Sequence, residues 1–385
     1  MLPQIIRVVE FVALAGTLAS AAYYLICIWG AISFLKQRKT ASLPSEGLPP
    51  VSILKPLRGV DPGMYESFRS YCQQEYPQYE IIFGVSEPED PAIAFVQRLQ
   101  QEFPEQNICL VRCEEKLGAN IKVSNLAQML EHSHHEFLIV SDSDIRVPSN
   151  YLQEAAGPLA DPQIGLVTCL YRGVASNSLG SRLEALGIGT DFCAGVLAAR
   201  QLEGIRFGLG STLAFRRRDL LSIGGFESLA DYLADDYELG NRIALGGKKV
   251  ILSDAVVESF LPKYSFGQFL QHQLRWARTL RASRPLGYFG LILTFGLPWA
   301  LLTLFCSMGA FWAWCALAAM VLVRIGVAYG VGTLLLRDPQ VMQWLWLLPI
   351  RDLIAVPIWV GSYTGSQVAW RGDLFTLKDG KLARN

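Results

Sequence analysis

Apolar residues gather in three long runs at the two ends of the chain. The first run, 11–35, holds 25 residues without a charge, and a helix of about 20 residues is long enough to cross the hydrocarbon layer of a membrane. The second run, 286–336, contains one charged residue and is too long for a single crossing, so it predicts a helical hairpin. The third run, 341–370, is interrupted by charges and prolines. It predicts either a further crossing or a broken helix near the membrane surface.

The first apolar run has two interpretations. The small residues of LASAA, 18–22, offer a cleavage site for a signal peptide, but the apolar run continues well beyond them, which favours an uncleaved membrane anchor. Lys36, Arg38 and Lys39 follow the run, whereas only Arg7 precedes it. Cytoplasmic flanks of membrane helices are rich in Lys and Arg, so the long segment that follows is predicted to lie in the cytoplasm.

The C-terminal crossings leave two questions open. One crossing, a hairpin and one more crossing would place the basic tail outside, whereas the distribution of positive charge favours the inside. Arg324 and Arg351 lie within the apolar runs, where a charge is costly. Each arginine either extends to the lipid headgroups or lies near a phosphate-bearing ligand.

Between the apolar ends, the pattern alternates between strands and helices. Strands are predicted at 51–57, 79–87, 108–113, 137–144 and 164–172, and helices at 64–75, 91–102 and 122–132. Asp90 and Pro91 are typical of a helix start. The β-α-β-α order predicts an α/β fold with a mostly parallel sheet covered by helices. In such sheets, ligands bind beyond the carboxyl ends of the strands.

Composition excludes several classes of protein. Lys and Arg together number 34 and Asp and Glu together number 34, so there is no broad basic surface for nucleic acid. Half of the chain is hydrophobic, at 51%, and only 18% is charged, which fits a membrane-associated protein better than a soluble one. The eight cysteines are scattered and form no CxxC pair, so no disulfide framework is expected.

Acidic residues follow two of the predicted strands. Glu87 and Glu89 come after IIFGV, and Asp142 and Asp144 come after FLIV. We expect them to line one crevice at the same edge of the sheet. Two carboxylates spaced D-x-D tolerate their mutual repulsion when a divalent cation lies between them and a phosphate. Mg²⁺ and Mn²⁺ prefer oxygen ligands, so Asp142 and Asp144 predict a metal site.

A third acidic cluster lies in LADDYELGNRI, 233–243, which reads as a helix that begins near Asp235 and Asp236. Acids at a helix start are often simple capping residues. The alternative is a functional carboxylate.

A basic amphipathic helix is predicted at 264–285. Arg275, Arg278, Arg281 and Arg284 recur every three residues. The helix would lie on anionic lipid, form a charge clamp for a diphosphate, or do both.

Two further segments have less certain roles. Lys122 and Asn125 lie on one face of a predicted helix. There they would either reach a diphosphate or base or be exposed surface residues. The loop FGLGSTLAFRR, 207–217, is either a turn into a strand or a loop that borders the sugar.

The acidic motifs and the basic helix, taken in their order along the chain, resemble the motifs of the ceramide glucosyltransferase family, which is glycosyltransferase family 21. Within that family, the chain most resembles the bacterial branch that glycosylates hopanoid lipids. The resembling pieces are VSILKPLRGVDP (51–62), DPAI (90–93), KVSNL (122–126), SDSDIRV (141–147), ADDYELGNRI (234–243), HQLRWAR (272–278) and WRG (370–372). The resemblance implies a GT-A fold, a nucleotide-sugar donor, a divalent cation (Mg²⁺ or Mn²⁺) and a lipid acceptor.

The resemblance also implies roles for individual residues. Glu87 takes the first acidic position, near the nucleotide base, where the family usually has Asp. Asp142 takes the second position, and Asp144 completes the D-x-D for the metal, at a place where ceramide enzymes often have Gly. Asp236 is the general base. Nucleotide-sugar binding is assigned to Glu87, Lys122, Asp142, Arg275 and Trp276, with His272 at the lead position of the R-W motif.

The combined prediction is an integral membrane enzyme with its catalytic domain in the cytoplasm, in the bacterial inner membrane. It is an inverting glycosyltransferase that moves a hexose, glucose or N-acetylglucosamine, from a UDP-sugar to a hydroxyl of a hopanoid (bacteriohopanetetrol) or ceramide. The alternatives are a polysaccharide synthase, for which about four candidate membrane segments are too few, and a non-catalytic membrane scaffold. The predicted segments are an anchor (1–39), a linker (40–50), the GT-A domain (51–262), an interfacial helix (263–285), membrane helices (286–370) and a basic tail (371–385).

Overall fold

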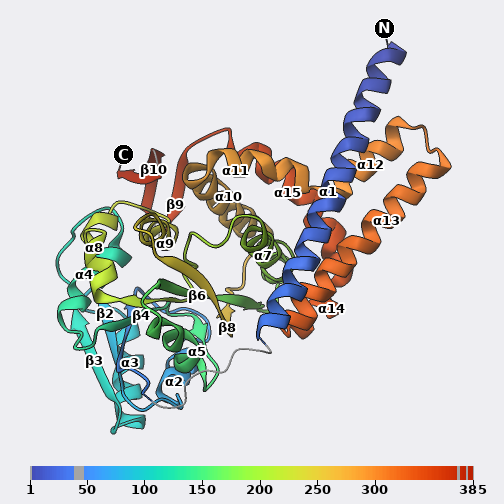
Figure 1. The fold of residues 1–385 in the computed structure, drawn as a ribbon. Coiled ribbons are helices and arrows are strands. Elements are labelled where there is room, and N and C mark those ends of the chain that lie inside the picture. The colour runs from blue at the N-terminus through green and yellow to red at the C-terminus, as the bar shows by residue number, and fades with distance from the viewer. Residues whose placement is uncertain (1, 39–46, 371–372, 379, 385) are drawn as a thin grey trace. The chain divides into compact units, whose positions relative to one another are not determined.

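The computed structural model describes residues 2–38, 47–370, 373–378 and 380–384 (Figure 1). The chain divides into two compact units. The helical unit comprises Met1–Thr40, Asn177–Gly204 and Lys263–Arg371, and the catalytic unit comprises Ala41–Ser176, Ile205–Pro262 and Gly372–Asn385. The segment predicted as the GT-A domain therefore contributes residues 177–204 to the helical unit, whereas the C-terminal tail belongs to the catalytic unit.

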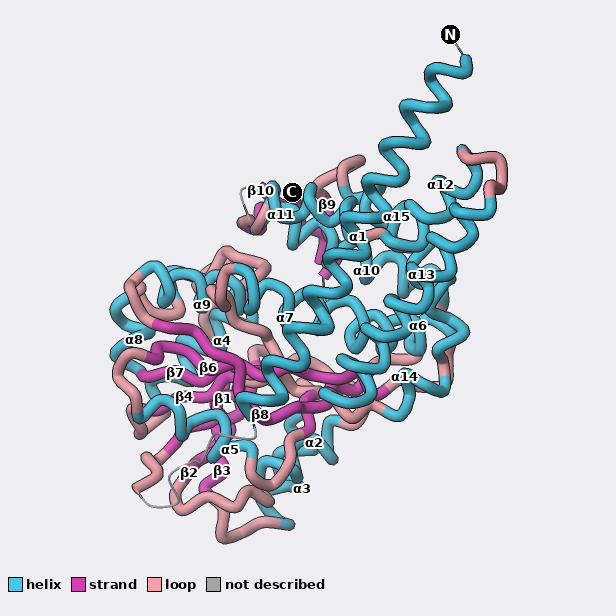
Figure 2. The backbone as a smooth tube through the Cα atoms, turned by 45° about the vertical axis from the view of Figure 1, so that its right-hand side comes forward, coloured by secondary structure: helices cyan, strands magenta, loops and turns pink. Residues whose placement is uncertain are grey.

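An eight-stranded sheet forms the centre of the catalytic unit, in the order β3-β2-β1-β4-β7-β6-β8-β5 (Figure 2). The pairs β1–β2, β1–β4, β2–β3 and β6–β8 are parallel, and β4–β7, β6–β7 and β5–β8 are antiparallel. The predicted α/β class with a mostly parallel sheet is confirmed. The strands are β1 (Val51–Leu57), β2 (Tyr79–Val85), β3 (Asn107–Arg112), β4 (Phe137–Val140), β5 (Ile145–Arg146), β6 (Ile164–Val174), β7 (Leu213–Arg216) and β8 (Lys249–Phe260).

Helices between the strands bury apolar faces against the sheet. Phe68 of α2 and Phe83 of β2 are fully buried, with ring centroids 4.6 Å apart, and burying one such side chain stabilises the fold by about 1.5–3 kcal/mol. Asp90 accepts a hydrogen bond from the Ala92 backbone N–H at 2.8 Å, as expected of a residue that starts α3. The helices are α2 (Met64–Cys72), α3 (Ala92–Glu102), α4 (Ile121–Glu131), α5 (Tyr151–Ala156), α8 (Arg217–Ser222) and α9 (Asp235–Leu245), with short turns η1 (Gly157–Ala160) and η3 (Glu227–Leu229).

The helical unit holds three helices that are long and apolar enough to cross a membrane, within the described residues: Gln4–Arg38, Phe311–Leu335 and Leu345–Ser362. A pair of helices bent by 51°, Pro285–Thr294 and Gly296–Cys306, is a fourth candidate. The elements are α1 (Leu2–Arg38), α6 (Leu179–Gly187), η2 (Ile188–Phe192), α7 (Cys193–Leu202), α10 (Phe266–Ser283), α11 (Pro285–Gly290), η4 (Leu291–Thr294), α12 (Gly296–Cys306), α13 (Phe311–Val327), η5 (Ala328–Leu335), α14 (Pro339–Gln343), η6 (Leu345–Leu347), α15 (Leu348–Ser362) and β9 (Gln367–Trp370).

Arg324 of α13 is buried in the helical unit and does not extend to lipid headgroups. Its side chain is only 4% exposed and contacts the carboxylates of Asp352, at 2.8 Å, and Asp191. It also donates to the Thr190 backbone oxygen at 3.1 Å. A cation within an apolar region is tolerated when it is paired and fully hydrogen-bonded. Because Thr190 and Asp191 lie on η2, this ion cluster joins the segment 177–204 to the apolar helices.

The C-terminal tail folds into a hairpin of the catalytic unit. Its strands, β10 (Asp373–Lys378) and β11 (Lys381–Arg384), pair antiparallel. The backbone N–H of Leu382 donates to the Asp231 carbonyl oxygen at 2.7 Å, just before α9. Residues near the end of the chain therefore lie beside the third acidic motif.

Candidate functional site

The carboxylates of the second and third acidic motifs meet on one lysine. The Lys122 ammonium, on α4, lies 2.8 Å from Asp142 Oδ1 and 3.3 Å from Asp235 Oδ2. Asp142 follows β4, and Asp235 opens α9. The structure therefore brings together a strand end and a helix start that are far apart in the sequence.

Gly210 lies beside both Asp142 and Asp236. A Cβ atom added at Gly210 would lie 3.2 Å from Asp142 Oδ2 and 3.2 Å from Asp236 Oδ2, so these two oxygens lie no farther apart than twice that distance. The backbone N–H of Gly208 donates to the Asp236 carbonyl oxygen at 3.2 Å, which holds this loop against α9. The loop predicted as either a turn or a sugar-bordering segment thus lies directly beside the two carboxylates.

The hydroxyl residues of the same loop have a structural role. Ser211 and Thr212 are buried. Ser211 Oγ donates to the Cys169 carbonyl oxygen at 3.1 Å, and the Thr212 carbonyl oxygen accepts from Thr168 Oγ1 at 2.7 Å. These bonds tie the loop to β6 and leave the glycine, not the hydroxyls, facing the acids.

The charges of the cluster change the proton affinity of its members. Burial opposes the charge on Lys122, but the carboxylates of Asp142, Asp235 and Asp236 outweigh it and raise the pKa of this lysine. Burial, and next the neighbouring charge of Asp235, raise the pKa of Asp236 to about 6. A carboxylate of raised pKa is a stronger proton acceptor than an ordinary aspartate.

Lys55 is a member of the site that the sequence analysis missed. Its side chain is fully buried in β1, and its ammonium donates to the Asp142 carbonyl oxygen at 2.8 Å and lies 3.9 Å from the Tyr71 ring centroid. Burial lowers the pKa of Lys55 to about 7, against the attraction of Asp142 and Asp144. The available signal was a lysine in the middle of the apolar strand VSILKPL. Buried lysines rarely occur without a partner.

Asp144 lies beside β8, where its Oδ2 accepts a hydrogen bond from Ser259 Oγ at 2.5 Å. Burial, followed by the charge of Asp142, raises the pKa of Asp144 to about 6. Across the described part of the chain, no three or more His, Cys, Asp or Glu side chains gather as a metal cage. Cations such as Mg²⁺ are commonly held by one or two carboxylates together with substrate phosphates. The donor chemistry of Asp142 and Asp144 fits such an ion.

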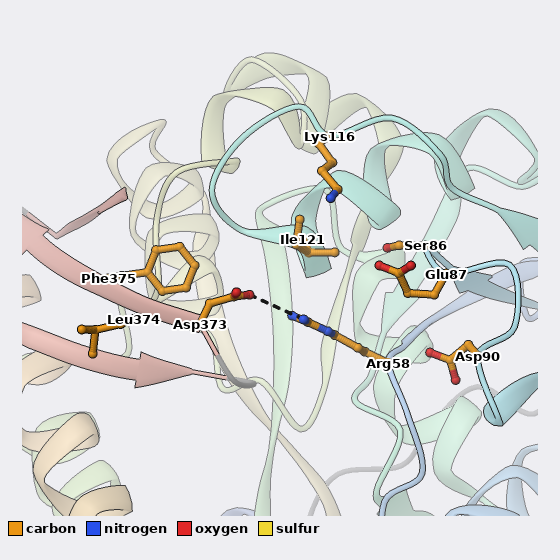
Figure 3. Close-up of a pocket in the computed structure, with 9 residues that line it drawn as sticks. All are labelled: Arg58, Ser86, Glu87, Asp90, Lys116, Ile121, Asp373, Leu374 and Phe375. Carbon is orange, nitrogen blue, oxygen red and sulfur yellow. Dashed lines mark hydrogen bonds and ion pairs between the residues drawn. The ribbon is translucent and has the colours of Figure 1, made fainter. Parts of the chain in front are cut away.

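Glu87 lines a cavity of about 390 Å³ in the catalytic unit (Figure 3). The first turn of α4 connects this cavity to the acidic cluster, because Ile121 lines the cavity and the adjacent Lys122 binds Asp142. Asn120 starts that turn, accepting from the Val123 backbone N–H at 3.2 Å and donating to the Tyr232 carbonyl oxygen at 2.7 Å. The lining residues are Arg58, Ser86, Glu87, Asp90, Lys116, Ile121, Asp373, Leu374 and Phe375.

Asp90 of the DPAI motif stabilises the cavity wall. Its two carboxylate oxygens accept from the Gly59 backbone N–H at 3.1 and 2.8 Å, and one of them also accepts from Ala92. Gly59 has a φ of 70°, a conformation that glycine adopts without strain. Asp90 thereby joins the loop after β1 to the start of α3.

Arg275 and Trp276 lie on α10, in the helical unit. The Trp276 ring packs near Phe192, at 6.0 Å between centroids, and near His272, at 5.3 Å. His272 Nδ1 lies 2.9 Å from a carboxylate oxygen of Glu184, which is almost fully buried. The assignment of Arg275 and Trp276 to the donor stays a prediction.

Residues 12–383 match the family described as Glycosyl transferase family 21. The chain belongs to this family. Ceramide glucosyltransferase 3 from Caenorhabditis elegans is 27% identical over 280 residues, covering 72% of this chain but only 61% of that protein. Ceramide glucosyltransferase 1 from the same organism is 22% identical, covering 97% of this chain and 82% of the relative.

Among solved structures, the family 21 chain is similar in fold to the mannosyltransferase PcManGT from Pyrobaculum calidifontis, in complex with GDP-Man and Mn²⁺. The two share 22% identity with a TM-score of 0.56, over 91% of this chain and 98% of the other. The predicted GT-A fold, family resemblance and glycosyltransferase activity are confirmed. The alternative of a non-catalytic scaffold is therefore wrong. The hopanoid branch stays a prediction.

Proposed function

We propose that this family 21 glycosyltransferase transfers a hexose, glucose or N-acetylglucosamine, from a UDP-sugar to the hydroxyl of a membrane lipid and inverts the anomeric configuration. The observation that carries the proposal is the convergence of Asp142, Asp235 and Asp236 around Lys122, one helical turn from the Glu87 cavity. A nucleotide sugar has parts that match both places. Its nucleoside suits a cavity, and its diphosphate needs positive charge, which a divalent cation held by the carboxylates would supply together with Lys122.

The donor is proposed to bind with its nucleoside in the cavity beside Glu87 and its diphosphate at the acidic cluster. A divalent cation held by Asp142 and Asp144 would supply charge that stabilises the departing diphosphate. Lys122 provides a fixed positive charge at the same place. Arg275 and Trp276 of α10 are proposed to contribute further contacts to the diphosphate.

Asp236 is proposed to act as the general base. In the transfer, the acceptor oxygen forms a bond with the anomeric carbon, the bond between that carbon and the diphosphate oxygen breaks, and the hydroxyl proton passes to Asp236. The raised pKa of Asp236 suits this role, since a general base works best when its pKa is close to the working pH. A single displacement of this kind inverts the anomeric centre.

The acceptor is proposed to be ceramide or a hopanoid such as bacteriohopanetetrol. Two observations support a lipid: the relatives are named ceramide glucosyltransferases, and the chain has three helices able to cross a membrane within its described residues. The basic residues after the first apolar run support a catalytic unit on the cytoplasmic face of a bacterial inner membrane.

The test is a transfer assay with the full-length protein in lipid nanodiscs. UDP-glucose and UDP-N-acetylglucosamine are each offered with ceramide and with bacteriohopanetetrol, and the product's size and anomeric configuration are read by mass spectrometry and NMR. One sugar per lipid with an inverted linkage supports the proposal, whereas long chains would support a polysaccharide synthase.

The role of Asp236 is tested in the same assay. Asp236→Asn should lower kcat by about 10²–10⁴-fold, the usual contribution of a general base. The matched control is Glu238→Gln on the same helix, because Glu238 pairs with Arg242, at 3.2 Å, and not with the acidic cluster. Parental turnover in Asp236→Asn would refute the assignment.

A further inference from the structure

The C-terminal hairpin is attached to the catalytic unit by specific contacts. Besides the bond from Leu382 to Asp231, Lys381 pairs with Tyr232 as an isolated β-bridge, and its ammonium lies 5.3 Å from the Tyr232 ring centroid. Phe375 and Leu382 are buried, at 2% and 5% exposure. A segment with buried apolar side chains and backbone hydrogen bonds to its host is part of the folded unit and not a loose tail.

The first residues of this hairpin line the cavity that contains Glu87. Asp373, Leu374 and Phe375 form one side, and Glu87 and Lys116 lie on the other (Figure 3). The Asp373 carboxylate points across the cavity to Arg58, with 3.5 Å between Asp373 Oδ2 and Arg58 Nη2. The cavity is therefore completed by residues that come after all the apolar helices in the sequence.

The lining suits a nucleoside attached to phosphate. Its volume of about 390 Å³ falls within the range of about 300–1,000 Å³ that is usual for small-molecule sites. Arg58 and Lys116 supply positive charge for phosphate, and Ile121 and the exposed Leu374 supply apolar surface for a flat base. Carboxylates accept hydrogen bonds from ribose hydroxyls and from the N–H groups of a base.

Of the three carboxylates in the lining, Asp90 is committed to backbone N–H groups. Glu87 and Asp373 differ from it because both are exposed to the cavity or solvent. The Asp373 side chain is 49% exposed, and its ion pair with Arg58 is long, at 3.5 Å. Such exposed pairs contribute little to stability, so stability alone does not account for a carboxylate at this position.

We infer that the C-terminal hairpin forms a wall of the donor site, with Asp373 accepting a hydrogen bond from the nucleoside of a uridine diphosphate and the buried Phe375 holding that wall in place. This inference rests on the proposed function. It makes the tail a specificity-determining part of the enzyme. Arg58, which pairs with Asp373 on the cavity wall, would contact a phosphate of the bound donor.

The test compares donor affinity with acceptor affinity in full-length variants. Asp373→Ala should raise the donor KM and the Kd for UDP by about tenfold, the loss expected for one hydrogen bond to a charged group. The lipid KM and the thermal midpoint should stay unchanged. Lys378→Ala is the matched control, because Lys378 is exposed on the same strand and does not line the cavity. Phe375→Leu, which keeps the position apolar, should raise the Kd for UDP less than Asp373→Ala.

A charge exchange separates binding from a purely structural role. The double variant Arg58→Asp/Asp373→Arg keeps an ion pair between the two positions but exchanges the charges. If Asp373 served only to hold Arg58 in place, this variant should bind the donor as the parent enzyme does. The inference expects the double variant to stay impaired, and its recovery would overturn the inference.

The remaining outcomes distinguish the inference from the proposed function. Unchanged UDP affinity in Asp373→Ala, with an active parent enzyme, overturns the role of the hairpin and leaves the function standing. UDP binding that depends on Asp373, with no transfer to any lipid, overturns the function and leaves the hairpin's role standing. A parent enzyme that binds no UDP overturns both.

Discussion

Replacing Gly210 with alanine tests the geometry of the acidic site with one methyl group. The new Cβ would lie 3.2 Å from oxygens of both Asp142 and Asp236, which is closer than ordinary van der Waals contact. The methyl would lie against both carboxylates, next to the place where the proposed chemistry needs the sugar and the attacking hydroxyl.

The expected effect is large for catalysis and small for folding. Gly210 is not among the glycines with positive φ, so alanine brings no backbone strain, and a Gly→Ala change at a compatible position stabilises a protein by about 0.4–1 kcal/mol. The carboxylates need to move by only a few tenths of an ångström to relieve the contact. The methyl itself would displace the reacting groups further, and a misplacement of about 1 Å at a reacting centre can cost about 10²-fold in rate, so we expect a loss of kcat of about that size.

The assay measures kcat, the Kd for UDP and the thermal midpoint of the full-length protein. Gly267→Ala is the control, because a Cβ there meets no atom within 4 Å. We expect Gly210→Ala to keep the parental thermal midpoint and UDP affinity while losing turnover. Retention of more than half of the parental kcat would show that the reacting atoms do not lie between Asp142 and Asp236, and would refute the proposed site.

Three further predictions follow from the charges. Because Asp236 has a pKa of about 6 and its protonated form cannot accept a proton, kcat/KM should fall about tenfold for each pH unit below about 6; a profile that is flat from pH 7 to pH 5 would contradict this. Lys122 lowers the pKa of Asp236, so Lys122→Met should move that acidic limb to higher pH and raise the donor KM, and an unshifted limb would count against the cluster. Arg324→Leu should destabilise the protein by about 3–5 kcal/mol, because it leaves a buried carboxylate of Asp352 unpaired. In thermal unfolding, Arg324→Leu combined with Asp352→Leu should recover part of this loss, and equal midpoints for all three proteins would argue against a buried ion pair.

The local sequence pattern was sufficient to predict most helices and strands of the catalytic unit. The run VSILKPL was predicted as a strand at 51–57 and forms β1 over the same residues. The helix expected at 91–102 is α3, Ala92–Glu102, preceded by Asp90 as a capping acceptor. These predictions succeed because periodicity, proline and capping act within a few residues of one another. β7 lies in the segment 207–217, for which a turn into a strand was one of two interpretations. β8 was not predicted, although it has 12 residues.

The candidate site was predicted in part. The sequence motifs located Asp142, Asp236 and Lys122, because acids at strand ends and helix starts are visible in local order. Lys55 and Gly210 were missed as site residues. A lysine in an apolar strand and a glycine in a loop carry no functional signal until the partners that surround them are known.

The sequence by itself determined the α/β class, the apolar helices at both ends and the acids that are proposed to carry the chemistry, since each depends on residues close together in the chain. Tertiary structure alone decided that residues 177–204 join the helical unit, through Asp191 and Arg324, and that the last residues complete the Glu87 cavity. The physical reason is that these contacts join positions far apart in sequence. Their free energy depends on burial and charge pairing that arise only when the whole chain has folded.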